Sequence, residues 1–485
     1  MKEKIYIGWG ETDITPRKKI NLAGQFFERI SEYVETPLSA TAMYIKCGGE
    51  SVVICSCDLV HITPELISRV KTILIGTGVD TEKMIICATH THTSYLYYEE
   101  NSGITLHLLD KYLGKENEPE ARDDVMTPSE ALDFISHGVA EAIKKSYDDL
   151  TDAYIANGFG RAVVGHCRRV VYDGGSAKMY GDSECASFEG LEGSSDSGIE
   201  LLYTFDSEKK LRGIVVNVAC PSQVLEHRRF VSSDYWGKVR QLLRDKYGSD
   251  LFILGLCGAA GDQSPRDMIR WVEPESPTGD PNITRERPTP RRADVSMFDI
   301  EGSWTLGRRI CAAVAEAYPC ESELRGCVSL SHMKREVGFP VRKVTPDEYE
   351  AAKNQLESFV RPKEGITYHD RARLHLCCGT MARFEQQQKT TLYNNEIHVF
   401  ALDGIVFATN PFELFLDFGN KIKARSSAEQ TFLIQLASGS GGYLPTAKAE
   451  RGGHYSAYVS SGITGHEGGE LLVGTTLDMI YSLIG

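Results

Sequence analysis

Two histidines, His90 and His92, are the residues whose type and spacing most directly suggest chemistry. They lie in the stretch Ala88-Thr-His-Thr-His-Thr-Ser94, directly after the apolar residues Met84 to Cys87. Because side chains alternate along a strand, histidines at positions i and i+2 where a strand ends point to the same side. Neutral imidazole is a common zinc ligand, and small neighbours leave room for an ion and a substrate. The pair indicates either a metal site or ordinary strand-end histidines.

A glycine-rich segment, Gly258-Ala-Ala-Gly-Asp-Gln-Ser-Pro265, is the second candidate. Glycines permit tight turns and a close approach of the backbone to a ligand. Ser264 is either a nucleophile activated by a base or a metal, or a serine that stabilises a turn. The segment lacks both the Gly-x-Ser-x-Gly elbow and the Lys-Ser/Thr ending of a phosphate loop, which disfavours a serine triad and nucleotide hydrolysis.

Polar or small residues follow many of the predicted strands. In open α/β sheets, functional groups gather where strands end, so this recurrence predicts one shared site. The residues in these positions are Asp58, His90, Arg168, Asp234, Ser264, Glu413 and Tyr443.

The elements that position these residues follow from apolar periodicity and turn signals. Strands near 42–47 and 51–56 are predicted to form a hairpin at Gly48-Gly49, and Gly8 to Pro16 is predicted to be a turn-rich segment after a short strand. Helices are predicted at 64–75, 128–147, 236–247, 303–317 and 346–360, and from about Leu471 onward.

Two long segments, 95–127 and 272–295, are predicted insertions. The first begins with Tyr95, Tyr97 and Tyr98 and continues with many charges, so it is either a lid or substrate wall or a solvated insertion. The second is rich in proline, arginine and acidic residues and is predicted to be exposed. Because no clear linker divides the chain, residues 1–485 are predicted to form one domain.

Composition excludes several classes of function. The net charge of −14 argues against nucleic acids and anionic membranes as partners. No secretory signal and no stretch of ~20 apolar residues is present, and thirteen cysteines without framework spacing favour reduced thiols. We therefore expect a cytoplasmic protein that acts on a small molecule; no pattern indicates an oligomeric state.

Several motifs together resemble the neutral/alkaline non-lysosomal ceramidases, zinc amidohydrolases that cleave the N-acyl bond of ceramide. The resemblance implies an α/β fold, with mixed β-sheets flanked by helices, and zinc as the cofactor. In the family's order, the matching pieces are Gly8-x-Gly-x-x-Asp-Ile-Thr-Pro16, Cys57-Asp58, Ala88 to Ser94, Gly261-Asp-Gln-Ser-Pro265, Asn410-Pro-Phe-Glu413, Gly442-Tyr-Leu-Pro-Thr446 and Gly453-His-Tyr455.

The resemblance also implies roles for individual residues. The residues that would bind zinc are His90, Glu413 and Tyr443. The catalytic set would comprise His92 on the amide carbonyl, Ser264 near the scissile bond, and Tyr455 and Arg168 (with Arg169 as the alternative) as further contacts to the carbonyl or oxyanion.

The sequence departs from this family at the second zinc histidine. The stretch Val218-Ala-Cys-Pro-Ser-Gln-Val224 has Pro221 where the resemblance implies that ligand. His227 is the first substitute because imidazole suits zinc, with Gln223 and Cys220 as alternatives; a three-ligand site or a different metal is equally open. Asp234 is expected to support the site from outside the ligand set.

Further departures concern the substrate. Family members are typically secreted or membrane-associated and carry a C-terminal immunoglobulin-like domain, which we expect to be absent here. The sequence therefore predicts a divergent, cytoplasmic hydrolase of an amide or ester bond in a smaller and more polar substrate. The alternatives are a ceramidase-like ligand-binding protein without catalysis, and a carbohydrate-active enzyme that pairs Asp262 with Glu413 about 5–9.5 Å apart.

Overall fold

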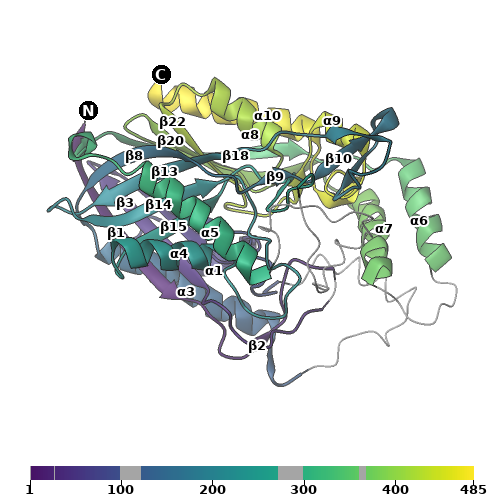
Figure 1. Ribbon diagram of the computed structural model, residues 1–485, viewed down its shortest axis with the longest axis horizontal. Helices are drawn as coiled ribbons and strands as arrows, with labels where there is room; N and C mark the ends of the chain where they lie inside the picture. The colour runs from purple at the N-terminus through teal and green to yellow at the C-terminus, as the bar shows by residue number, and fades with distance from the viewer. Residues whose placement is uncertain (1, 27, 99–121, 271–298, 360–367) are drawn as a thin grey trace.

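Three β-sheets with helices on their outer faces form the body of the protein (Figure 1). The computed structural model describes residues 2–26, 28–98, 122–270, 299–359 and 368–485. The predicted insertion at 272–295 and most of the one at 95–127 lie outside the described residues. Parallel and antiparallel pairs occur together in all three sheets, so the predicted α/β fold with mixed sheets is confirmed.

The first sheet includes the N-terminal strand and is covered on its outer face by two helices. Its strands, in spatial order, are β17 (Cys327–Val328), β1 (Glu3–Asp13), β3 (Ser39–Cys47), β4 (Glu50–Cys57) and β5 (Met84–Ala88), with β7 (Thr151–Asp152) beside β1. Apolar side chains of this sheet pack against the covering helices α1 (Pro64–Ile73) and α3 (Pro128–Asp148). The predicted hairpin and both predicted helices are confirmed.

The turn-rich segment predicted from Gly8 to Pro16 is wrong, because β1 continues to Asp13. Its glycines serve packing: a Cβ on Gly10 would lie 2.1 Å from the carbonyl oxygen of Ala142 in α3. A sequence reading takes such glycines as turn signals because the helix that requires them lies more than a hundred residues away.

The second and third sheets lie against the other face of the first. The second contains β15 (Phe252–Cys257), β14 (Leu211–Val218), β13 (Gly198–Phe205) and β8 (Tyr154–Arg161), covered by α4 (Tyr235–Tyr247) and α5 (Asp299–Glu316). The third contains β18 (Leu330–Pro340), β19 (Leu392–Leu402), β20 (Ile405–Thr409) and β22 (Gln430–Ile434), covered by α8 (Leu416–Arg425) and α10 (His466–Ile484).

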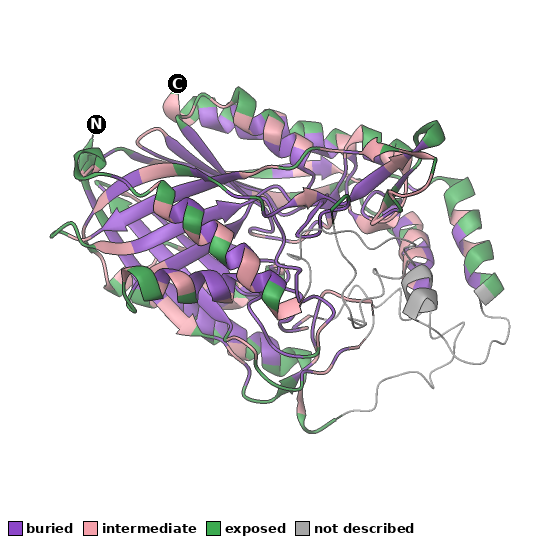
Figure 2. Ribbon diagram, in the orientation of Figure 1, coloured by how far each residue is buried: buried purple, intermediate pink, exposed green. Residues whose placement is uncertain are grey.

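A central apolar core joins all three sheets. Trp9 of the first sheet, Leu254 of the second and Phe407 of the third belong to the same buried cluster. Phe407 stacks on Phe400 and on Phe432, with ring centroids 4.5 and 4.3 Å apart. In Figure 2 the sheets are almost entirely buried, whereas the covering helices alternate between buried and exposed residues.

The carboxyl ends of three parallel strand pairs meet at one place. These pairs are β4 with β5, β14 with β15, and β20 with β22. The backbone N–H of Ala88 donates to the carbonyl of Leu436 at 3.2 Å, and that of Gln435 donates to the carbonyl of Cys257 at 3.0 Å. Residues that follow these strands are therefore brought together.

A helical hairpin projects from the third sheet between β18 and β19. It consists of α6 (Pro346–Phe359), which was predicted, and α7 (Tyr368–Gln386), which was not because its sequence shows no clear apolar stripe. Figure 1 shows the hairpin at one end of the molecule, apart from the sheets. Its own small core consists of Ala352, Leu356, Leu374, Cys377, Cys378 and Met381.

Short elements complete the described part of the chain. They are β2 (Lys19–Ile20), β6 (Val125–Met126), β9 (His166–Cys167), β10 (Arg169–Tyr172), β11 (Ala177–Met179), β12 (Phe188–Leu191), β16 (Gln263–Ser264), β21 (Glu413–Leu414), β23 (Tyr443–Leu444), α9 (Ala447–Gly452) and the 3₁₀ turns η1 (Thr81–Lys83), η3 (Asp173–Gly175), η4 (Glu321–Glu323) and η5 (Val459–Ser461). Over the described residues, no helix has the length and apolar character needed to cross a membrane. The thirteen cysteines are free thiols.

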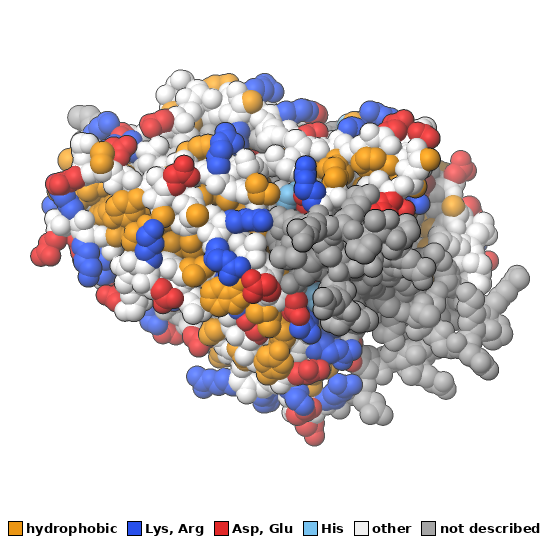
Figure 3. All heavy atoms as spheres, in the orientation of Figure 1, with side chains coloured by type: hydrophobic (Ala, Val, Ile, Leu, Met, Phe, Trp, Pro, Cys, Tyr) orange, Lys and Arg blue, Asp and Glu red, His pale blue; other side chains and the backbone are white. Residues whose placement is uncertain are grey.

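Tyr95 and Tyr97, at the start of the predicted insertion at 95–127, belong to the core. Their hydroxyl groups donate to the carbonyls of Ile14 and His61 at 2.6 and 2.7 Å, and both side chains are buried. On the face drawn in Figure 3, the described basic and acidic side chains are interspersed.

Candidate active site

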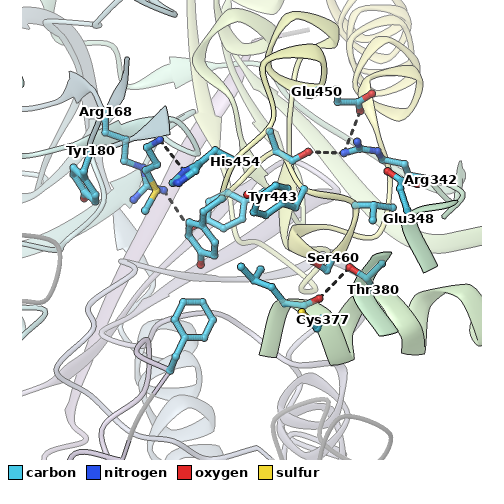
Figure 4. Close-up of a pocket in the computed structure, with 18 of the residues that line it drawn as sticks. Arg168, Tyr180, Arg342, Glu348, Cys377, Thr380, Tyr443, Glu450, His454 and Ser460 are labelled. Carbon is cyan, nitrogen blue, oxygen red and sulfur yellow. Dashed lines mark hydrogen bonds and ion pairs between the residues drawn. The ribbon is translucent and has the colours of Figure 1, made fainter. Parts of the chain in front are cut away.

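A cavity of about 700 Å³ opens where the strand ends meet. The α6–α7 hairpin forms one wall, and loops that follow β5, β14 and β22 form the floor. Figure 4 shows Arg168 and Tyr180 at one end of the cavity and Arg342, Glu348 and Glu450 at the other. The polar residues of its lining include His92, Arg168, Gln223, Glu226, Tyr443 and Tyr455.

His90 is held in one orientation by backbone contacts. Its Nδ1 lies 2.6 Å from the carbonyl oxygen of Val60, and because a carbonyl only accepts, Nδ1 carries the proton. The other nitrogen, Nε2, lies 3.4 Å from Oε2 of Glu413 and 3.3 Å from Nε2 of His92. Metal-binding histidines are commonly oriented in this way, by a hydrogen bond from the nitrogen that does not bind the metal.

Glu413 and Tyr443 are brought together by two short parallel strands. β21 and β23 pair so that Glu413 stands directly opposite Tyr443, and their side chains are hydrogen-bonded. Burial raises the pKa of the Glu413 carboxyl, but His90 and Arg168 outweigh it, so the pKa lies below its ordinary value. Burial and then the charge of Glu413 raise the pKa of Tyr443 well above its ordinary value.

Arg168 is a buried cation in the cavity wall. It donates from Nη2 to the hydroxyl of Tyr443 at 3.1 Å and to the carbonyl of Gly261 at 3.0 Å, and from Nη1 to Oε1 of Gln223 at 3.4 Å. Among the described residues, no carboxylate lies within ion-pair distance, and the Arg168 Nε has no hydrogen-bond partner. All its direct acceptors are therefore neutral, which leaves its charge available to a ligand.

Arg169, the alternative to Arg168, has a different place. It pairs with Glu192 at 2.6 Å and donates to the carbonyls of Gly453 and Tyr455 at 2.8 and 2.9 Å. Arg169 thus holds the loop that carries Tyr455, whereas Arg168 faces the cavity.

Tyr455 lies against Tyr443 with its ring edge-on, and the centroids are 5.5 Å apart. It also contacts Phe26, with centroids 5.6 Å apart. Burial, followed by the charge of Glu413, raises the pKa of Tyr455 above its ordinary value, so its hydroxyl keeps its proton at neutral pH. It is therefore able to donate a hydrogen bond into the cavity.

His92, Gln223 and Glu226 form the part of the floor nearest His90. The His92 Nε2 lies 2.8 Å from Nε2 of Gln223, and its Nδ1 lies 3.6 Å from Oε2 of Glu226. Burial, and then the neighbouring His90, Arg29 and Arg168, lower the pKa of His92 well below its ordinary value. Sequence reasoning named Gln223 only as a substitute zinc ligand and missed Glu226.

Two solved ceramidase structures are similar to this arrangement over nearly the whole chain. Neutral ceramidase from Pseudomonas aeruginosa matches with a TM-score of 0.66 and 16% identity, covering 99% of this chain and 75% of that one. The protein has a ceramidase-like fold. A structure described as a ceramidase complexed with C2 matches with a TM-score of 0.64 and 14% identity, covering 99% and 76%. No protein-family model and no curated protein matches the sequence.

Within this ceramidase-like fold, Ser264 lies behind the cavity wall. It is fully buried in β16, and its Oγ lies 3.1 Å from the hydroxyl of Tyr180. The described cavity lining includes Tyr180 but not Ser264. Tyr180 was missed because nothing in the sequence near it signals a contact with a serine 84 positions away.

The three substitutes for the absent zinc histidine have different surroundings. Gln223 lines the cavity, whereas the Cys220 thiol is directed to the carbonyls of Val164 and Pro221 at 3.6 and 3.5 Å. His227 is buried and is not part of the described lining. Of these residues, only Gln223 is placed to contact a ligand.

Two buried carboxylates stabilise the loops around the site. Asp234 accepts from the backbone N–H groups of Leu225 and Tyr235, both at 2.7 Å, and burial raises its pKa to about 7. Asp262 accepts from the N–H of Leu416 at 2.9 Å, and burial raises its pKa to about 6. Asp262 is absent from the described lining, so nothing favours it as a catalytic partner of Glu413.

No three His, Cys, Asp or Glu side chains of the described residues are grouped so that they could hold a metal ion. The third side chain beside His90 and Glu413 is the phenol of Tyr443. A free imidazole nitrogen, a carboxylate and a phenol are all groups that bind divalent metals, and catalytic zinc sites usually use three protein ligands. The donor set is therefore compatible with zinc only if the phenol takes part.

Proposed function

We propose that the protein is a hydrolase that cleaves an amide or ester bond in a small, polar substrate bound in the cavity. The observation that carries this proposal is the meeting of His90 Nε2, the Glu413 carboxylate and the Tyr443 hydroxyl beside the buried cation of Arg168. An arginine surrounded only by neutral acceptors suits a reaction in which negative charge develops on the substrate. The ceramidase-like fold agrees with such a reaction.

We further propose zinc as the cofactor, with His90, Glu413 and Tyr443 as the residues that would hold it. When bound, zinc supplies Lewis acidity for the carbonyl group and lowers the pKa of a bound water molecule. The fixed Nδ1–H of His90 leaves Nε2 as the nitrogen that would face the ion.

Arg168 and Tyr455 supply the remaining chemistry in this proposal. Their N–H and O–H groups donate to the carbonyl oxygen as it becomes an oxyanion, and each such donor is worth about 3–4 kcal/mol in other hydrolases. Water adds to the carbonyl carbon, the C–N or C–O bond breaks, and the leaving group takes up a proton. Ser264, behind Tyr180, positions that tyrosine, and water is the nucleophile.

The polar character of the substrate follows from the far end of the cavity. Arg342, Glu348 and Glu450 line that end, opposite Arg168 (Figure 4), and Gln355 on the same helix as Glu348 also belongs to the lining. Charged and amide side chains solvate polar groups, so the substrate in this proposal places polar groups here, beside apolar lining residues such as Ala352 and Leu376.

Metal analysis combined with His90→Ala tests the proposal. We expect about one zinc per chain in the purified wild-type protein. In the variant we expect the metal to be lost and the hydrolysis of short N-acyl amides to fall at least 100-fold. His137→Ala is the matched control, because His137 is exposed on α3 and should leave both unchanged. Wild-type protein that is metal-free and indifferent to added zinc would contradict the mechanism.

A ligand-binding protein without catalysis is the second candidate. It is favoured by the limited set of metal-binding groups among the described residues. Saturable binding of an N-acyl amide by calorimetry, with no product even after zinc is added, would support this candidate over the hydrolase.

A further inference from the structure

Four polar side chains that line the cavity are arranged in a row, and the proton positions along this row can be assigned. Arg168 Nη1 lies 3.4 Å from Oε1 of Gln223, and Nε2 of Gln223 lies 2.8 Å from Nε2 of His92. At the far end, Nδ1 of His92 faces Oε2 of Glu226 at 3.6 Å, which is an electrostatic contact longer than a hydrogen bond. All four side chains are at least nine-tenths buried, so water competes little for these contacts.

The positions of the donors and acceptors in this row follow from the chemistry of its two end groups, a guanidinium and a carboxylate. A guanidinium group has only donors, so the Gln223 atom facing Arg168 is the amide oxygen, and the amide nitrogen faces His92. An amide nitrogen only donates, so Nε2 of His92 accepts and has no proton. The proton of a neutral His92 is then on Nδ1, which faces the Glu226 carboxylate, a group that accepts.

We propose that Gln223 is a positioning residue that holds His92 in the tautomer with the proton on Nδ1 and holds Arg168 toward the substrate. The catalytic consequence of this inference rests on the proposed function, whereas the tautomer of His92 does not. The Nε2 of His92 has a single lone pair, and the amide N–H of Gln223, at 2.8 Å, occupies it. The Nε2 of His90 lies farther away, at 3.3 Å, and has no proton to donate because its proton is on Nδ1. His92 is therefore part of the frame around Arg168, in place of the carbonyl donor role that the resemblance implies.

Gln223 is itself firmly placed. Its backbone N–H donates to the carbonyl of Pro221 at 2.9 Å, which closes a tight turn, and the hydroxyl of Ser222 donates to the carbonyl of Thr89 at 2.7 Å. The first contact lies within the turn after β14, and the second connects that turn to the loop that carries His90 and His92. The proline at position 221 thus contributes to the turn that presents the Gln223 amide.

A neutral residue at position 223 also preserves the charge of Arg168. An amide oxygen orients the guanidinium without neutralising it, whereas a carboxylate would form an ion pair with it. The amide thus keeps the cation both aligned and available, as stabilisation of an oxyanion requires.

Nuclear magnetic resonance of protein labelled with ¹⁵N-histidine tests this assignment directly. The two imidazole tautomers have clearly different nitrogen shifts, and loss of a signal in His92→Asn identifies His92. We expect the Nδ1–H tautomer in the wild-type protein. In Gln223→Glu, which keeps the side-chain shape but only accepts, we expect a proton on Nε2.

The same variant has an expected kinetic signature. Because the new carboxylate would pair with Arg168, we expect kcat for N-acyl amide hydrolysis to fall at least 10-fold, with a smaller change in KM. Gln355→Glu is the matched control for the spectrum: it places the same carboxylate in the same cavity, on α6, and should leave the His92 tautomer unchanged.

A wild-type spectrum with the proton on Nε2, or nitrogen shifts of His92 that do not respond to Gln223→Glu, would overturn the inference. If Gln223→Glu does not fold, Glu226→Gln replaces it: the Nδ1–H tautomer should persist, since Gln223 is sufficient to set it, and its loss would overturn the inference. A correct tautomer in a protein that hydrolyses no amide or ester would contradict the proposed function alone.

Discussion

Close packing around His92 depends on one glycine and one arginine. Gly24 has a φ of +91°, and a Cβ there would lie 2.5 Å from Cγ of His92. The buried Arg29 donates to the carbonyls of Ala23, His92 and Glu226 at 2.6 to 2.7 Å, so it joins three separate loops. At the scale of single residues, the position of His92 therefore depends on Gly24 and Arg29 as well as on the side chains that would act on a substrate.

Gly24→Ala should distort the site. The unfavourable positive φ should lower the free energy of unfolding by about 1–3 kcal/mol, and the added methyl group should displace the His92 ring and reduce turnover. Urea unfolding and hydrolysis rates measure the two effects. Gly76→Ala is the control, because Gly76 also has a positive φ, +78°, but no atom lies within 4 Å of the position that an added methyl group would take. This variant should lose stability but keep its activity.

Residue types alone indicated only part of the site. His90, Glu413 and Arg168 follow predicted strands and have side chains that suit chemistry, so a sequence reading can find them. Gln223 and Tyr180 could not be found in this way, because an amide or a phenol acquires its role from neighbours on other elements.

At the scale of elements, β1 and α3 make a close backbone contact that requires glycine on the strand. Gly8 and Gly10 allow the helix backbone to lie directly on the strand: a Cβ would be 2.0 and 2.1 Å from carbonyl oxygens of α3. The helix was predictable from its apolar spacing and its Thr127 cap, which receives the N–H of Glu130. The strand was only partly predictable, because its glycines resemble turn signals.

Gly10→Ala should force β1 and α3 apart. Because the neighbouring atoms are backbone and cannot move independently, we expect the free energy of unfolding to fall by about 1–3 kcal/mol or more. Gly49→Ala is the comparison, since Gly49 lies in the β3–β4 turn with open space around it and should change stability by less than about 0.5 kcal/mol. Equal effects of the two substitutions on urea unfolding would show that the close contact is absent.

At the scale of the whole molecule, one buried and one half-buried histidine make stability depend on pH. His332 on β18 and His398 on β19 face each other, with Nε2 and Nδ1 3.0 Å apart. Burial above all lowers their pKa values, to about 4 for His332 and about 3 for His398. Between about pH 6.5 and pH 4 the unfolded chain binds protons that the folded protein does not, so stability falls as the pH falls.

His398→Gln should weaken this dependence. Each proton taken up only on unfolding contributes about 1.4 kcal/mol per pH unit, so removing one such group should reduce the slope by up to that amount between pH 6 and pH 4.5. Urea unfolding across this range measures the slope. His137→Gln, on the exposed face of α3, is the control, and a slope identical in wild type and His398→Gln would contradict the argument.

The fold class could be predicted from the sequence, but the way in which the sheets and helices pack together could not. Periodicity located most helices and the strands that precede the candidate residues. It could not show that three sheets share one core, or that the α6–α7 hairpin forms a cavity wall, because those facts depend on contacts between distant segments.

The backbone hydrogen bonds that join the three strand ends also have a kinetic consequence. Residue 88 bonds to residue 436, and residue 435 to residue 257, so the cavity floor exists only after segments from both ends of the chain have met. Contacts between such distant residues form slowly, because the long intervening loops must be closed first. Activity should therefore return after the secondary structure in refolding, which hydrolysis rates and circular dichroism followed in parallel would measure.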